Sequence, residues 1–321
     1  MARHLLDTDT LLELDRRYRV FVKALPPRLA QLASDRGALE GDGPSRPLRT
    51  VGQFGVSVTG PWAFRDIFPG LTEEQLLDLG ENWIFLMSAI LLQDHLADDQ
   101  LPAGVYAAEL QRRFITKVNE GFYSLIGDCP VFWQRFEQYK HQTKSALQLE
   151  AYYRTSPQAT YDLAVAWHIG AGKSALFKAI PWAMVVLSDE PWYFARLEAS
   201  INALVAGGQL MDDIVDWRED LARGHYTYPL AQAISRLHSL GLRVSPQAIE
   251  ALFLESTFIK DLLEQVKAWY RQAAEAVDGI PCQLWIGLLN SNIEECTWYH
   301  LWWVIWRIAQ AAKEKGHMAQ Q

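Results

Sequence analysis

Two groups of aspartates are the residues of this sequence best suited to chemistry. They are Asp94, Asp98 and Asp99 in a first cluster, and Asp212, Asp216 and Asp220 in a second cluster. A step of four residues in an α-helix returns to nearly the same face and rises about 6 Å along the axis. If each segment is helical, Asp94 and Asp98 would therefore share one stripe, and so would Asp212, Asp216 and Asp220.

The residues that come before each cluster on its stripe are uncharged. They are Trp83, Met87 and Ile90 before Asp94, and Val205, Gly208 and Gln209 before Asp212. Like charges on one helix face repel each other, and partial burial disfavours an ionised carboxylate. A cation is therefore expected, and oxygen ligands without an imidazole or thiolate pattern suit Mg²⁺. The sequence predicts two metal-binding acidic rims above an apolar pocket, with surface charges at helix ends as the alternative.

Helical periodicity covers most of the chain and positions both clusters. The predicted helices span residues 11–24, 27–34, 73–99, 103–126, 131–149, 161–187, 192–222, 257–276 and 294–313, with a break or kink in 161–187 near Gly170–Gly172 and Pro181. Thr72 and Gln75 have the spacing of a capping box at the start of 73–99. Residues 36–61, rich in Gly, Pro and Ser, are predicted to form a long loop or flap. We expect one all-α domain over residues 1–321, a large bundle with a central apolar cavity.

Composition and charge exclude several classes of protein. Half of the 321 residues are hydrophobic, which is too many for a disordered chain. The 30 basic and 38 acidic residues give a net charge of −8 without a basic stripe, which argues against a nucleic-acid partner. Three cysteines without a CxxC pair favour free thiols. With no signal peptide and no apolar run long enough to span a bilayer, we expect a cytoplasmic protein without a transmembrane segment.

Several segments resemble motifs of one superfamily. Asp212-Asp213-Ile-Val-Asp216 resembles the second aspartate-rich motif of trans-prenyl diphosphate synthases, and the continuation through Leu230 resembles squalene and phytoene synthases. Asp94-x-x-x-Asp98-Asp99 is similar to the first metal motif, and Gly172-Lys173-Ser174 resembles a Lys-Thr pair that contacts diphosphate. The chain thus looks like a divergent member of the class I isoprenoid (terpene) synthases, which implies their all-α fold.

The resemblance implies a reaction and a role for each candidate residue. More than one Mg²⁺ ion, or Mn²⁺ as an alternative, would bind the two aspartate clusters and grip the diphosphate of an allylic prenyl substrate. Further contacts to diphosphate would come from Lys173, Arg223 and Tyr226. Trp83 would present its aromatic face to the carbocation, with a packed core residue as the alternative.

Three activities are left open by the sequence. No Arg-Arg-Gly follows Asp99 and no early Gly-Gly-Lys-x-Arg is present, so a cyclase that rearranges one prenyl diphosphate is the leading hypothesis. The alternative enzyme joins two prenyl diphosphates head to head or elongates one of them. A helical protein that binds isoprenoids without catalysis is the alternative from a different class. A homodimer is compatible with the sequence.

Two further features have two interpretations each. Asp213 and Glu219 point off the main acidic stripe, so each either supports a ligand or lies at the surface. Gly207-Gly208 lowers helix propensity, and the pair makes room either for substrate or for a close contact with another helix.

Overall fold

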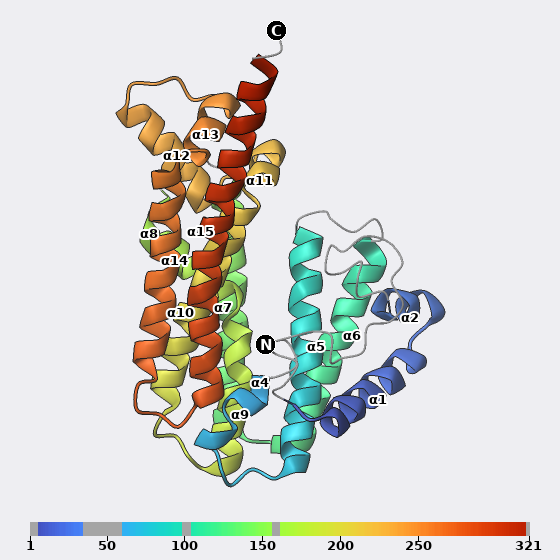
Figure 1. Cartoon of the computed structure of the whole chain (residues 1–321). Coiled ribbons are helices and arrows are strands. Elements are labelled where there is room, and N and C mark those ends of the chain that lie inside the picture. The colour runs from blue at the N-terminus through green and yellow to red at the C-terminus, as the bar shows by residue number, and fades with distance from the viewer. Residues whose placement is uncertain (1–5, 35–59, 98–103, 156–160, 319–321) are drawn as a thin grey trace. The chain divides into compact units, whose positions relative to one another are not determined.

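The computed structural model of the chain describes residues 6–34, 60–97, 104–155 and 161–318. In these residues the structure contains fourteen α-helices, two short 3-10 helices and no strand (Figure 1). The α-helices are α1 (Thr8–Ala24), α2 (Pro27–Ser34), α4 (Gly60–Ala63), α5 (Glu73–Ala97), α6 (Gly104–Ile126), α7 (Pro130–Arg154), α8 (Leu163–Lys173), α9 (Ala179–Ser188), α10 (Phe194–Val215), α11 (Trp217–Arg223), α12 (Tyr228–Ser239), α13 (Pro246–Phe253), α14 (Ser256–Ala276) and α15 (Gln283–Met318). The prediction of an all-α protein is confirmed.

Two predicted helices are divided in the structure. The segment 161–187 forms α8, the 3-10 helix η5 (Ala175–Lys178) and α9, so the chain breaks after Lys173. Pro181 causes no break because it lies in the first turn of α9, where its missing N–H has no helical partner to lose. The segment 192–222 forms α10 and α11, which are separated at Asp216. The sequence predicts that one unbroken helix carries the acidic stripe of the second cluster. That prediction is wrong, because α10 ends before Asp216.

Besides the four-residue α4, two helices of the structure are absent from the sequence prediction. They are α12 and α13, and both have proline in the first turn. The Ser245 hydroxyl caps α13 by accepting a hydrogen bond of 3.1 Å from the Ala248 N–H. Ser-Pro is a recognisable start signal for a helix, but α12 and α13 have only twelve and eight residues, so the helical pattern repeats few times in each. Of the predicted flap at 36–61, the structure describes residues 60 and 61, which begin α4.

The start of α5 confirms the predicted capping box. The Thr72 N–H donates to Gln75 Oε1 at 2.9 Å, and the Gln75 N–H donates to Thr72 Oγ1 at 3.2 Å. Both bonds satisfy N–H groups that have no partner inside the helix. The helix then continues through Asp94 and is described as far as Ala97. Asp98 and Asp99 lie outside the described residues.

The contacts of the chain divide it into two compact units. Unit 1 contains residues 1–138, 176–194 and 280–285, and unit 2 contains residues 139–175, 195–279 and 286–321. Within unit 1, α5 and α6 pack together along an aromatic core in which the Phe85 ring lies 4.7 Å from that of Phe21 and 5.8 Å from that of Phe114. The single domain over residues 1–321 stays a prediction.

One described helix, at Glu73–Gln93 of α5, is long and apolar enough to cross a membrane by length and composition. Most of this segment is buried in the structure, as expected for the core helix of unit 1. The predicted compartment stays a prediction.

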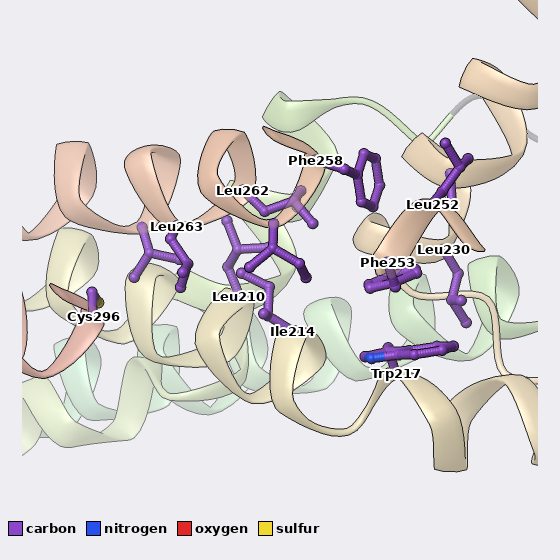
Figure 2. Close-up of a cluster of buried hydrophobic side chains, with 14 of the residues drawn as sticks. Leu210, Ile214, Trp217, Leu230, Leu252, Phe253, Phe258, Leu262, Leu263 and Cys296 are labelled. Atoms are coloured by element: carbon purple, nitrogen blue, oxygen red, sulfur yellow. The ribbon is translucent and has the colours of Figure 1, made fainter. Parts of the chain in front are cut away.

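Unit 2 has a hydrophobic core between α10, α11, α13 and α14. The Trp217 ring stacks on Phe253 with ring centres 4.2 Å apart and planes at 10°, and the edge of Phe258 meets Phe253 (Figure 2). Leu210 and Ile214 of α10 belong to the same cluster, alongside side chains of α14. This core holds the ends of α10 and α11 that carry the second aspartate cluster.

The adjacent glycines of α10 give a matched test of this packing. A Cβ at Gly207 would lie 2.5 Å from Cε1 of the buried Tyr270, whereas a Cβ at Gly208 would meet nothing within 4 Å. Gly207→Ala should therefore lower the free energy of unfolding by about 1–3 kcal/mol. Gly208→Ala should leave it unchanged or raise it by up to about 1 kcal/mol, because alanine favours helix. Urea unfolding of both variants measures the difference, and equal stabilities would contradict the helix-contact interpretation of Gly207.

Candidate functional site

Helix α8 approaches its neighbours in unit 2 through two glycines. A Cβ at Gly170 would lie 2.8 Å from the Ala206 Cα of α10, and a Cβ at Gly172 would lie 2.5 Å from the Ala146 Cβ of α7. Only residues without a side chain allow backbones to come this close. The end of α8, at Lys173, is thereby held against both α7 and α10.

Lys173 forms an ion pair below the surface. Its Nζ lies 2.8 Å from Glu150 Oε1, and the two side chains are 10% and 12% exposed. Arg154, one turn further along α7, places a guanidinium nitrogen 3.5 Å from the same carboxylate oxygen. Low exposure to water strengthens such charge–charge interactions. Lys173 is also the last residue of α8, where the helix dipole favours a positive charge.

Asp213 faces this ion pair from α10. Gln209 Nε2 donates a hydrogen bond of 2.8 Å to Asp213 Oδ1. Burial raises the pKa of Asp213 to about 8, opposed by this hydrogen bond and by the charge of Lys173, and assisted by Asp220 and Glu150. The carboxyl group of Asp213 therefore titrates close to neutral pH.

The sequence did not identify Glu150 and Gln209 as members of this cluster. Gln209 had a local signal, since it lies four residues before Asp213 on the same helix face. Glu150 had none, because it meets Lys173 only through the packing of α7 against α8. Asp213, with its two open interpretations, lies within this cluster.

The second aspartate cluster sits at the bend between α10 and α11. Backbone hydrogen bonds still join Asp216 to Asp212 at 2.9 Å and Asp220 to Asp216 at 3.0 Å, so the four-residue steps survive the bend. The side chains of Asp212 and Asp216 are exposed, and that of Asp220 is half-buried. Trp217 fixes the bend by inserting into the core of unit 2 directly after Asp216.

The residues after α11 return to α7. Arg223 pairs with Glu219 at 3.2 Å, one turn back in α11. Gly224 ends the helix with φ of 71°, a conformation that favours glycine. The Tyr226 N–H then donates to the Arg154 carbonyl at 3.3 Å. Tyr226 is thus tied to the part of α7 that holds Glu150, while contacts of Arg223 and Tyr226 to diphosphate stay predictions.

The first cluster belongs to unit 1. Asp94 lies in the last turn of α5, as the sequence predicted for that position. Trp83 is buried in the same helix, with its ring centre 5.3 Å from Phe177 and close to the backbone of Gly60. Its indole N–H is buried without a hydrogen-bond partner among the described residues. Trp83 is therefore a packed residue of unit 1, and its role beside a carbocation stays a prediction.

The donor groups of unit 2 suit a hard cation. Asp212 and Asp216 offer exposed carboxylates one helical turn apart near the C-terminal end of α10, where the helix dipole also favours positive charge. Across the described part of the chain, no three His, Cys, Asp or Glu side chains form a group that could hold a metal ion alone. Mg²⁺ commonly binds one or two carboxylates and completes its shell with water and substrate phosphate. The two aspartates fit that mode of binding.

The raised pKa of Asp213 predicts a pH dependence of stability. A carboxyl group whose pKa is higher in the folded than in the unfolded state binds more protons when folded, so stability falls as pH rises between the two values. For Asp213 that window runs from about 4 to about 8. Relative to wild type, the free energy of unfolding of Asp213→Asn should increase by up to about 1.4 kcal/mol for each pH unit within this window.

Urea unfolding at about pH 5 and about pH 8 measures this effect on Asp213. Asp261→Asn is the matched control, because Asp261 is an exposed aspartate of α14 in the same unit. Parallel pH profiles for wild type and Asp213→Asn would show that the carboxyl group is ionised in the folded protein.

Comparison with known proteins places the fold. No protein-family model matches the chain, and no curated protein matches it. Among solved structures, octaprenyl pyrophosphate synthase from Helicobacter pylori matches 90% of this chain and 99% of its own, with a TM-score of 0.65 and 15% identity. The chain has the isoprenoid synthase fold. The predicted fold class is thus confirmed.

Two further structures with the isoprenoid synthase fold are similar. Geranylgeranyl pyrophosphate synthase from Lactobacillus brevis is 18% identical with a TM-score of 0.65, and covers 91% of this chain and 96% of its own. Polyprenyl synthase from Caulobacter crescentus, in complex with calcium and isoprenyl diphosphate, is 16% identical with a TM-score of 0.64, and covers 88% and 95%. At such identities the likeness concerns the fold. The names of these proteins correspond to the prenyltransferase alternative, rather than to the cyclase that was the leading hypothesis.

Proposed function

We propose that the chain is an enzyme that ionises an allylic prenyl diphosphate. The observation that carries the proposal is the polar cluster of unit 2, where Lys173, Glu150 and Asp213 lie at or near the C-terminal ends of α8, α7 and α10. Asp212 and Asp216, the predicted metal ligands, lie on the same end of α10. The sequence motifs and the isoprenoid synthase fold support the same substrate class.

The residues of this cluster suit a diphosphate group. Lys173 is a nearly buried cation that Glu150 already holds in place, so its ammonium group is oriented before substrate binds. A protonated Asp213 adds no negative charge to repel the anion and can donate a hydrogen bond to it. Bound Mg²⁺ would supply charge neutralisation for the leaving diphosphate. When the C–O bond breaks, the electron pair leaves with diphosphate and an allylic carbocation remains.

Transfer of that cation to a second isoprenoid is the first candidate for the next step. Its support is that the similar solved structures are named as octaprenyl, geranylgeranyl and polyprenyl synthases. Cyclisation of a single substrate is the second candidate. Its support is the segment Gln100-Leu-Pro-Ala-Gly-Val-Tyr106, which stands where an elongating synthase carries Arg-Arg-Gly.

Incubation with single substrates tests both candidates. The purified chain with Mg²⁺ is given geranyl, farnesyl or geranylgeranyl diphosphate, with and without isopentenyl diphosphate, and pyrophosphate release and products are measured. A longer prenyl diphosphate that forms only with isopentenyl diphosphate supports elongation, whereas a hydrocarbon or alcohol from one substrate supports cyclisation. A product of two allylic substrates indicates head-to-head coupling. Tight binding without pyrophosphate release would overturn the proposal in favour of a non-catalytic isoprenoid-binding protein.

A further inference from the structure

The outer face of α15 carries an exposed apolar stripe. Trp298, Leu301, Trp302 and Ile305 are 70%, 47%, 59% and 65% exposed. Their spacing of three, one and three residues places them on one face of the helix. We call these four residues the outer stripe.

The core of unit 2 does not explain the outer stripe. The opposite face of α15 already packs into that core through Cys296 and Trp303, which are buried. Helix α15 is therefore apolar on two opposite sides, although only one of them packs against the core of unit 2. Large exposed apolar side chains elsewhere in the described residues are more scattered, Leu12, Val105 and Trp192 among them. A contiguous exposed patch of this kind marks an interaction surface.

The charges at the two ends of the outer stripe differ. Glu294 and Glu295 are exposed in the turn before Trp298, so the apolar face begins only after them. Beyond it, residues 306–321 contain Arg307, Lys313 and Lys315 against a single acidic residue, Glu314. This excess of positive charge contrasts with the net charge of −8 of the whole chain. The stripe thus leads into a segment with an excess of positive charge, the sign that an anionic surface would attract.

We propose that the outer stripe binds the surface of an anionic lipid bilayer, with α15 lying in the plane of the interface. Tryptophan is enriched at membrane–water interfaces because its ring is apolar and its N–H is polar. A helix face that carries tryptophan and leucine, with basic residues nearby, binds in this way. Among the described residues, α15 is not a helix long and apolar enough to cross a membrane.

A second copy of the chain is the competing occupant. The basic residues that follow the stripe would repel each other wherever two copies brought them together. The lipid surface therefore fits the stripe and its flanking charge better than self-association does.

Vesicle flotation tests this proposal. The full chain is mixed with vesicles of phosphatidylcholine alone or of phosphatidylcholine with phosphatidylglycerol, and the fraction that floats is measured. We expect flotation with the anionic vesicles, and at least about tenfold weaker binding for Trp298→Ser/Trp302→Ser. Trp192→Ser is the matched control, because Trp192 is 78% exposed outside the stripe. It should float like wild type.

A charge variant and the mass in solution complete the test. Lys313→Glu/Lys315→Glu should also weaken binding to anionic vesicles, and added salt should weaken wild-type binding. Circular dichroism and light scattering check that each variant is folded and report its mass. The proposal is wrong if wild type does not float, if the tryptophan variant floats equally well, or if that variant converts a dimer to a monomer. These outcomes are independent of enzyme activity, so they do not depend on the proposed function.

Discussion

Asp212→Asn is expected to abolish pyrophosphate release while leaving the helical circular dichroism intact. Asp212 is an exposed residue of α10, so replacing its carboxylate by an amide creates no cavity and breaks no core contact. The change removes the negative charge that would hold a metal ion near diphosphate. Loss of one group that stabilises developing charge costs about 10²–10³-fold in rate, and loss of a bound metal ion costs more.

Asp94→Asn extends this test to the first aspartate cluster, since the resemblance assigns both clusters to metal binding. Asp261→Asn is the control, because it removes an exposed carboxylate from unit 2, which also holds Asp212, without touching either cluster. Pyrophosphate release is followed for all three variants at saturating Mg²⁺. Near-normal turnover of both Asp94→Asn and Asp212→Asn would eliminate the metal assignment, whatever the products are.

Trp217→Ala should lower the free energy of unfolding by about 3–5 kcal/mol. Its ring is 6% exposed and stacks on Phe253 with ring centres 4.2 Å apart. Truncation would leave a cavity between α11 and α13 and would also free the bend that positions Asp216. The rate of pyrophosphate release of this variant should therefore fall by more than the decrease in its folded fraction explains.

Two controls separate these effects at Trp217. Trp217→Phe retains an aromatic ring for Phe253 and should recover most of the stability and activity. Trp192→Ala removes a tryptophan that is 78% exposed and should stay within about 0.5 kcal/mol of wild type. Urea unfolding with pyrophosphate release on the same samples gives both readouts. A small loss for Trp217→Ala would show that the α10–α11 bend is held by other contacts.

Several features of this protein were encoded in residues close together along the chain. The helical periodicity predicted the all-α class, the Thr72–Gln75 spacing predicted the start of α5, and the aspartate motifs resembled those of proteins with the fold that the chain has. These features depend on side chains a few residues apart, which interact within one helix whatever the rest of the chain does. These features can therefore be predicted from the local sequence.

Other features depended on packing between distant residues. The sequence suggested one helix through Asp212, Asp216 and Asp220, but the stacking of Trp217 on Phe253 accompanies a bend at Asp216. Glu150 became part of the site only because glycines of α8 bring Lys173 against α7. The pKa of Asp213 likewise follows from burial among helix ends that are far apart in sequence. Such contacts arise from how helices pack, and no short-range pattern of residue types encodes them.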